Sequence, residues 1–249
     1  MLPRLFLDAQ VDEGSRMWVS GEDGHHFSRV LRARPGEDLV VCAANGPFWA
    51  EIAEVRSGEV CVHLRERAPS NEPRQRFVLV QGLAKGEKMD VILQKCTEIG
   101  AWGFVVFEAE RSVVKLSGPK VDQKLARWRK VVREAAMQAQ RDVVPFVVFA
   151  PNFSTSLAVI AEHEVHRVLV LDEEERERGI RSAMRAHGAG NRTAVVVGPE
   201  GGLASGERRL AKQDARCQTV TLGPRILRTE TAGAVALAIA LAESGDMGG

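Results

Sequence analysis

The first third of the chain has the pattern of a small β-rich domain. Over residues 37–66, the strand-like segments EDLVVCA, FWAEIAEV and EVCVHLRE are separated by the turn residues Asn45-Gly46-Pro47 and Ser57-Gly58. Such breaks are typical of consecutive antiparallel strands. Ahead of them, apolar residues recur at helical spacing over residues 21–32. We therefore predict a small β domain, in line with a small barrel, over residues 1–70.

A different pattern begins after residues 68–73, a polar segment with two prolines that marks the expected domain boundary. Beyond it, short continuous apolar runs recur: FVLVQG, FVVF, PFVVFA, RVLVL, TAVVVG and QTVTLG. Such runs are typical of parallel strands that are buried on both faces. Between them, residues 87–99 and 121–139 carry apolar side chains on one helical face. The alternation predicts an α/β domain with a mostly parallel sheet over residues 74–249.

The composition of the chain excludes several classes of protein. With 249 residues, 27% of them charged, and a net charge of +1, it matches an ordinary globular protein. No apolar run reaches the roughly 18 residues of a membrane span, and the first residues lack a signal-peptide pattern. We therefore expect a cytoplasmic protein that does not contact a membrane. The four cysteines are widely spaced, so we expect neither disulfides nor a metal site.

Positive charge is concentrated in the middle of the chain. Residues 71–160 contain 14 Lys and Arg against 9 Asp and Glu, whereas residues 1–70 contain 8 against 11. Basic residues recur every three positions along the predicted helix 121–139, at Lys124, Arg127, Lys130 and Arg133. This face fits contact with nucleic acid. A solvated helix surface explains the same pattern equally well.

Two segments near the C-terminus share one pattern, in which a buried-type strand ends in a Gly-Pro loop ahead of a helix. The first loop is Gly198-Pro-Glu-Gly-Gly202, and the second begins Gly223-Pro-Arg-Ile-Leu-Arg228. Open parallel sheets bind ligands outside the carboxyl ends of their strands, and glycine allows a ligand to approach the backbone closely. The loops also carry the charged residues Glu200, Arg228 and Glu230. The alternative is a pair of tight turns that serve only the topology.

Other familiar ligand motifs are missing or misplaced. Gly188-Ala-Gly190 precedes a strand instead of following one, so it does not match a dinucleotide-binding fingerprint. The segment Gly82–Lys88 has the wrong spacing for a phosphate-binding loop. His163 and His166 lack an accompanying acidic motif, so a polar helix surface is a better interpretation than a metal site. His25-His26 has two interpretations, contact with RNA or base catalysis on the one hand and partly exposed helix residues on the other.

The two loops together carry a family resemblance. Gly198–Gly202 and Leu222-Gly-Pro-Arg-Ile-Leu-Arg-Thr-Glu-Thr-Ala232 resemble the signature pair of the RsmE family, SPOUT-superfamily methyltransferases that modify N3 of a uridine in 16S ribosomal RNA. The likeness spans essentially the whole chain. It includes His26-x-x-Arg-Val-Leu-Arg32, Lys85-Gly-Glu-Lys-Met89, Gln94-Lys-x-x-Glu-Ile-Gly100, Glu110-Arg-Ser-Val-Val-Lys115 and Arg127-Trp-x-Lys130. One departure is Met137, which stands ahead of Gln138 where the family commonly has an acid.

The resemblance implies a fold and a cofactor. The family joins an N-terminal PUA-like barrel to an α/β domain whose C-terminal end is a deep trefoil knot. It binds S-adenosylmethionine within the knot loops. By position, this implies that the cofactor contacts Gly198, Pro199, Glu200, Gly201, Gly202, Leu222, Gly223, Ile226 and Leu227. Family members act as homodimers, and the alanine-rich segment 232–242 would suit burial at such a contact.

The resemblance also implies methyl transfer to uridine N3 in 16S rRNA of the small ribosomal subunit. Arg228 would stabilise negative charge on the uracil carbonyls, because a guanidinium does not accept a proton. Glu230 would act as the catalytic base or, alternatively, would cap the final helix. The basic residues expected to contact RNA include Arg29, Arg32, Lys88, Arg111 and Arg127.

Two other functions are compatible with parts of this pattern. One is a SPOUT enzyme that acts on another RNA or another base atom. The other is a non-catalytic RNA-binding factor that retains the fold. The presence of both cofactor loops argues against the non-catalytic factor.

Overall fold

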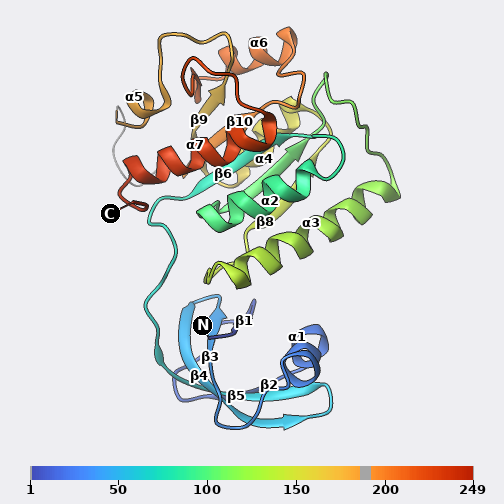
Figure 1. Cartoon of the computed structure of the whole chain (residues 1–249), viewed down its shortest axis with the longest axis vertical. Coiled ribbons are helices and arrows are strands. Elements are labelled where there is room, and N and C mark those ends of the chain that lie inside the picture. Colours follow the sequence, from blue (N-terminus) through green and yellow to red (C-terminus); the bar gives the residue numbers. More distant parts are fainter. Residues whose placement is uncertain (1, 186–191, 249) are drawn as a thin grey trace. The chain divides into compact units, whose positions relative to one another are not determined.

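The computed structural model describes residues 2–185 and 192–248 (Figure 1), so the segment Gly188-Ala-Gly190 lies outside the described residues. The chain forms two compact units. One comprises Met1–Glu72 together with Gln140–Val144, and the other comprises Pro73–Ala139 together with Pro145–Gly249. The grouping of residues 140–144 with the N-terminal unit differs from the sequence prediction, which treated residues 74–249 as uninterrupted.

The N-terminal unit is built on one five-stranded sheet with the strand order β1-β3-β4-β5-β2. Its strands are β1 (Arg4–Phe6), β2 (Arg16–Val19), β3 (Asp38–Ala43), β4 (Gly46–Arg56) and β5 (Glu59–Arg67). The β3-β4-β5 meander is antiparallel, as the turn residues predict, whereas β1 pairs with β3 in parallel. In place of one helix, residues 21–32 form the short α1 (Gly21–His25) and a π-helical turn, η1 (His26–Val30).

Buried ion pairs hold residues 140–144 in the N-terminal unit. Arg4 pairs with Asp142, and both side chains are almost fully buried. Arg141 Nη2 lies 2.5 Å from Glu72 Oε2, and Arg141 is buried as well. A buried charge is stable only with a partner of this kind. No hydrophobic pattern marks these pairs, so the sequence prediction missed the connection.

The second unit contains a six-stranded sheet with the strand order β11-β9-β10-β6-β7-β8, and all its pairings are parallel. The strands are β6 (Phe77–Gly82), β7 (Gly103–Phe107), β8 (Phe146–Ala150), β9 (Val165–Leu171), β10 (Arg192–Val197) and β11 (Cys217–Val220). The central strands are buried on both faces, which explains their continuous apolar runs. The predicted parallel α/β sheet is confirmed.

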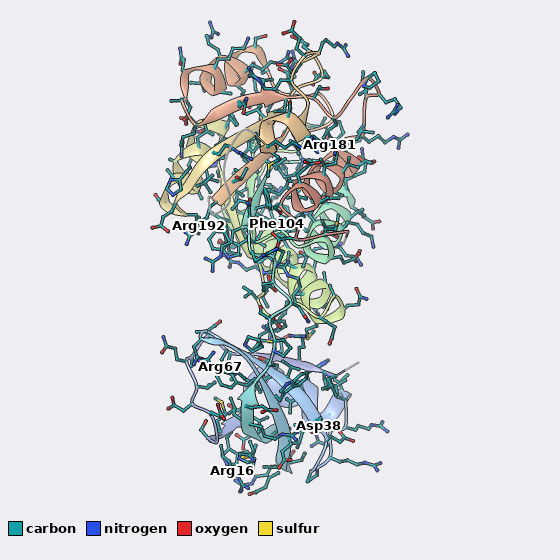
Figure 2. The ribbon with its side chains drawn as sticks, turned by 90° about the vertical axis from the view of Figure 1, so that its left-hand side faces the viewer. Arg16, Asp38, Arg67, Phe104, Arg181 and Arg192 are labelled. Atoms are coloured by element: carbon teal, nitrogen blue, oxygen red, sulfur yellow. The ribbon has the colours of Figure 1, made fainter. Side chains whose placement is uncertain are left out.

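Six helices of the described residues cover this sheet: α2 (Lys88–Ile99), α3 (Pro119–Gln138), α4 (Phe153–Glu162), α5 (Ile180–Arg185), α6 (Ser205–Gln213) and α7 (Thr229–Glu243). α2, α3 and α7 lie on one face, and α4 lies on the other (Figure 1). Figure 2 shows how the side chains follow from this layering: Phe104 of β7 is fully buried, whereas Arg181 of α5 is at the surface. No helix of the described residues is long and apolar enough to cross a membrane.

Candidate functional site

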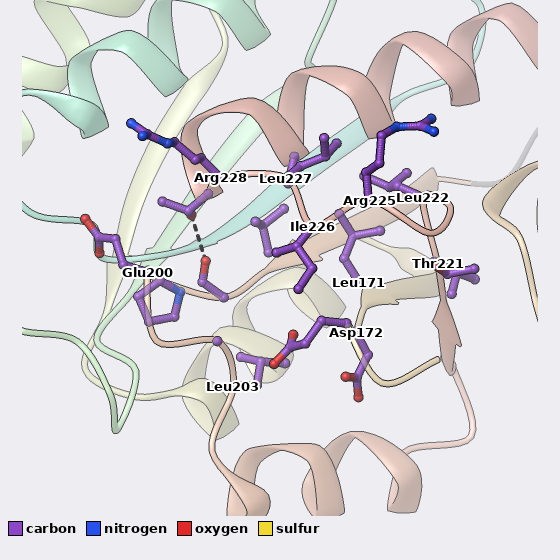
Figure 3. A pocket seen from close by; sticks show the side chains of 18 of the residues that line it. Leu171, Asp172, Glu200, Leu203, Thr221, Leu222, Arg225, Ile226, Leu227 and Arg228 are labelled. Carbon is purple, nitrogen blue, oxygen red and sulfur yellow. Dashed lines mark hydrogen bonds between the residues drawn. The ribbon is translucent and has the colours of Figure 1, made fainter. Parts of the chain in front are cut away.

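A cavity of about 530 Å³ lies at the carboxyl ends of β9, β10 and β11 (Figure 3). Most of its lining comes from three segments, residues 171–173 at the end of β9, residues 197–203 at the end of β10 and residues 220–229 at the end of β11, and Lys88, Arg176 and Ala232 complete it. This is the edge at which open parallel sheets bind ligands, and the volume is that of a small-molecule site. All nine residues predicted to bind the cofactor line the cavity, namely Gly198, Pro199, Glu200, Gly201, Gly202, Leu222, Gly223, Ile226 and Leu227.

Glycine is required in the first loop because the backbone folds tightly on itself. A Cβ on Gly198 would lie 2.9 Å from Gly202 C and 2.9 Å from Leu203 N. Gly202 has φ +67°, and a Cβ there would lie 2.9 Å from Glu173 Oε1. The loop therefore has no room for side chains at these positions, and its backbone forms part of the cavity wall.

A polar side chain at the end of β6 joins the two loops. Gln81 Nε2 donates a hydrogen bond to Thr229 Oγ1 at 2.9 Å, and this hydroxyl donates to the carbonyl oxygen of Gly198 at 2.8 Å. Next to it, a Cβ on Gly82 would lie 2.6 Å from Pro199 N and Cδ. The sequence analysis missed Gln81. The available signal was a polar residue near the end of the apolar run FVLVQG, which is fully buried in the structure.

Apolar side chains form one wall of the cavity. Leu203 is buried, Leu171, Leu222 and Leu227 are partly buried, and Ile226 is 82% exposed and points into the hollow (Figure 3). A large aliphatic side chain that is held open to solvent inside a pocket is suited to contact an apolar part of a ligand.

An acidic edge completes the cavity, and the sequence analysis missed it. Asp172 and Glu173 follow β9 and line the cavity. Arg208 of α6 lies 3.6 Å from Asp172 Oδ1 through Nη1 and 3.6 Å from Glu173 Oε1 through Nη2. The available signal was the run DEEERER, which comes directly after a buried-type strand. Negative charge here is suited to a ligand with a positive centre.

A row of four charged side chains forms the rim of the cavity beside α2 and α7. Lys88 Nζ lies 3.3 Å from Glu200 Oε1 and 3.2 Å from Glu230 Oε2. Arg228 Nη1 lies 3.9 Å from the other Glu230 oxygen, Oε1. The Arg228 side chain is 83% exposed, so its guanidinium is free to meet a substrate.

The Glu230 carboxyl is held in its ionised form. A hydrogen bond from its own backbone N–H, followed by Lys88 and Arg228, lowers its pKa below the ordinary value, although burial opposes this. Arg228, the N-cap residue of α7, makes no side-chain cap, whereas the Glu230 carboxyl accepts from its own N–H in the first turn of the helix, as the capping alternative expects. A carboxylate with a lowered pKa is a weak proton acceptor. The environment therefore favours a role in placing Arg228 over a role as a base.

The five residues predicted to contact RNA have different surroundings. Lys88 belongs to the rim, and Arg111 Nη1 donates to the carbonyl oxygen of Gly201 at 3.0 Å, so both support the first loop. Arg127 of α3 pairs with Asp90 but keeps 57% of its side chain exposed. In the N-terminal unit, Arg29 donates to Ser57 Oγ at 2.7 Å, and Arg32 is exposed with φ +52°.

The histidines considered for a metal site do not share a helix surface, since His163 ends α4 and His166 is an exposed residue of β9. The His163 ring stacks on Phe146, with the two ring centroids 4.0 Å apart. Among the described residues, no group of three His, Cys, Asp or Glu side chains is placed to hold a metal ion.

Comparison with known proteins gives this site a family. Residues 70–241 match a protein family described as an RNA methyltransferase domain. The chain belongs to this family. A Bacillus subtilis relative named ribosomal RNA small subunit methyltransferase E is 37% identical over 247 residues, which cover 95% of this chain and 94% of the relative. A Mycobacterium bovis relative of the same name is 37% identical over 235 residues, which cover 93% and 88%.

A solved relative shares the fold over its whole length. The crystal structure of ribosomal RNA small subunit methyltransferase E from Neisseria gonorrhoeae, bound to S-adenosyl methionine, has a TM-score of 0.82 and 27% sequence identity. The match covers 97% of this chain and 98% of that one. The resemblance to the RsmE family is therefore confirmed, and the protein is a methyltransferase with a parallel α/β domain.

Proposed function

We propose that this methyltransferase transfers a methyl group from S-adenosylmethionine to N3 of a uridine in 16S rRNA of the small ribosomal subunit. The observation that carries the proposal is the cavity after β9, β10 and β11, where both signature loops meet beside the exposed guanidinium of Arg228. The relatives named as small-subunit rRNA methyltransferases, one of them bound to S-adenosyl methionine, support it. A ribosomal substrate also places the protein in the cytoplasm.

The cavity fits this cofactor by its chemistry. The glycines of the first loop carry no side chains, so an adenine can approach the loop backbone closely, and Ile226 and Leu227 offer apolar contacts. Asp172 and Glu173 provide negative charge for a sulfonium and an ammonium group. When bound, S-adenosylmethionine supplies an electrophilic methyl group on a positively charged sulfur.

Arg228 acts on the substrate base in this proposal. Uridine N3 must lose its proton before it attacks the methyl carbon, and the negative charge then spreads over the two uracil carbonyls. The N–C bond forms as the C–S bond breaks, and the N3 proton leaves to solvent. Arg228 stabilises the charge on the carbonyls, with the Glu230 carboxylate 3.9 Å from its guanidinium. Positioning of the two reactants supplies much of the rate.

Single-turnover kinetics of Arg228→Ala test this role. Because the interaction strengthens as charge develops, the rate of methyl transfer should fall by roughly 10²–10³, with little change in cofactor affinity. Arg127→Ala is the comparison, since it should weaken RNA binding and its salt dependence but leave the rate at saturating RNA intact. Loss of cofactor affinity in Arg228→Ala, with a normal rate at saturation, would make Arg228 a structural residue.

The proposal extends to both domains of the fold. In this proposal, the N-terminal unit is a PUA-like barrel over residues 1–70, and it contacts RNA through Arg29 and Arg32. The domain from residue 74 ends in a trefoil knot. Arg29→Ala with Arg32→Ala should weaken RNA binding without changing cofactor affinity. A crystal structure with cofactor bound tests the knot and the barrel.

The active form is proposed to be a homodimer that contacts through α7. One face of α7 is buried, at Ala232, Ala236, Leu237 and Ala240. The opposite face leaves Ala234, Val235, Ala238 and Ile239 only partly covered, which is an apolar stripe suited to a second copy. Analytical ultracentrifugation at micromolar concentration should show a dimer. A fully active monomer at that concentration would contradict it.

A further inference from the structure

Lys88 occupies a position that its own helix disfavours. It is the first residue of α2, where the partial positive charge of the helix N-terminus repels a cation. The same ammonium is also partly withdrawn from water, with 28% of its side chain exposed. Residues in unfavourable positions of this kind are held there by their partners, and both partners of Lys88 are carboxylates of the cavity rim.

The two partners come from distant parts of the chain. Glu200 belongs to the loop after β10, and Glu230 belongs to the first turn of α7, yet Lys88 Nζ lies 3.3 Å from Glu200 Oε1 and 3.2 Å from Glu230 Oε2. One ammonium thus separates two carboxylates that stand on facing segments of the cavity rim. Without it, two negative charges would face each other across a partly buried gap.

We propose that Lys88 is a positioning residue that ties the loop after β10 to the start of α7 and so sets the width of the cofactor cavity. The proposal rests on the proposed cofactor. It assigns Lys88 to the cavity, whereas the sequence analysis assigned it to RNA. The effect on methyl transfer passes through Glu230, which holds Arg228.

The charge balance of the rim makes this role measurable. The charged side chains that face Glu200 and Glu230 in the described residues are Lys88 and, for Glu230, Arg228; Lys85 adds a backbone N–H to Glu200 at 3.2 Å. With Lys88 replaced by Met, the two carboxylates repel each other while both are ionised. Protonation of either one removes the repulsion, so the defect should shrink as the pH falls.

The experiment measures the dissociation constant of S-adenosylmethionine by calorimetry, without RNA, from pH 8 to pH 4. Lys88→Met should weaken binding about tenfold at pH 8. Its ratio to the wild type should fall toward one only as the pH approaches 4, because the pKa values of Glu200 and Glu230 lie below the ordinary 4.5: backbone N–H donors that remain in the variant lower both, although burial opposes this. Lys88→Arg should retain most of the affinity. The double variant Lys88→Met with Glu230→Gln should bind S-adenosylmethionine more tightly than Lys88→Met alone, because one of the two carboxylate charges is gone. Lys95→Met is the matched control, since Lys95 lies on the same helix and pairs only with Glu98 in the described residues.

Three outcomes are decisive. A Lys88→Met protein with wild-type cofactor affinity, weaker RNA binding and a smaller salt dependence would assign Lys88 to RNA and overturn the proposal. A tenfold defect that stays constant from pH 8 to pH 4, or that the added Glu230→Gln does not relieve, would also overturn it. A wild-type protein that fails to bind S-adenosylmethionine would refute the proposed function instead, so the two failures are distinguishable.

Discussion

The end of β6 approaches the loop after β10 closely, and Gly82→Ala tests whether this contact sets the shape of the cavity. The new Cβ would lie 2.6 Å from Pro199 N and Cδ and 3.0 Å from Gly198 C, whereas ordinary contacts begin at 3.4 Å. The loop would therefore have to move by about 0.8 Å. Its neighbours at this point are backbone and a rigid ring, so a rotamer change cannot relieve the contact.

The size of the effect follows from this displacement. Overpacking of this kind costs about 1–3 kcal/mol of the free energy of unfolding. A shift of about 1 Å in a positioning loop lowers catalysis by roughly a hundredfold. We expect a folded Gly82→Ala protein whose melting temperature is several degrees lower and whose affinity for S-adenosylmethionine is at least about tenfold weaker.

Calorimetry and thermal denaturation measure the two effects, and Gly206→Ala provides the matched control. Gly206 lies in α6, and its new Cβ would meet only Glu110 Oε2, at 3.8 Å. Replacing a helical glycine without a clash should raise the stability by about 0.5 kcal/mol and leave cofactor affinity unchanged. If Gly82→Ala matched the wild type in both measurements, the close approach of Gly82 to Pro199 would not constrain the cavity.

Three further predictions concern separate parts of the second unit. Ile226→Ser should weaken cofactor binding several-fold in calorimetry with an unchanged melting temperature, because an 82% exposed side chain adds little to folding; a large fall in melting temperature would contradict this. Glu207→Ala should destabilise the fold by about 1–3 kcal/mol in urea denaturation, because this buried carboxylate accepts from the N–H groups of Ala204 and Glu110; an unchanged midpoint would show that water replaces it. Burial alone would raise the pKa of Asp246, but hydrogen bonds from the N–H groups of Gln75 and Arg74 lower it below 3.8. The ionised carboxylate therefore stabilises the fold at neutral pH, and this stabilisation is lost as the pH falls through the pKa that Asp246 has in the folded protein. Asp246→Asn should therefore lower the melting temperature at pH 7 but not near pH 2, and an equal loss at both would contradict this.

Much of the fold could be predicted because its signals are local. Continuous apolar runs indicate strands that are buried on both faces, and all six strands of the parallel sheet follow them. Gly100 ends α2 at φ +123°, as a glycine after an apolar helical face predicts. The two Gly-Pro loops could be placed at one edge of the sheet because the carboxyl ends of parallel strands share that edge.

The missed features depend on contacts between distant residues. Residues 140–144 belong to the N-terminal unit through Arg4 and Glu72, which pair with Asp142 and Arg141 respectively. The sequence pattern predicts that Lys88 is a surface cation, and only the fold brings it between two carboxylates. Gln81 and Asp172 were missed for the same reason, since a single polar residue at the end of a strand has no periodic signal.

The identity of the methylated atom tests the account most directly. The protein is incubated with S-adenosylmethionine labelled on the methyl group and with small ribosomal subunits that lack the modification, and the labelled nucleotide is mapped and digested to nucleosides. We predict label on N3 of a single uridine in 16S rRNA and loss of that label with Arg228→Ala. Label on another RNA or another base atom, or none from a folded protein that binds the cofactor, would contradict the account.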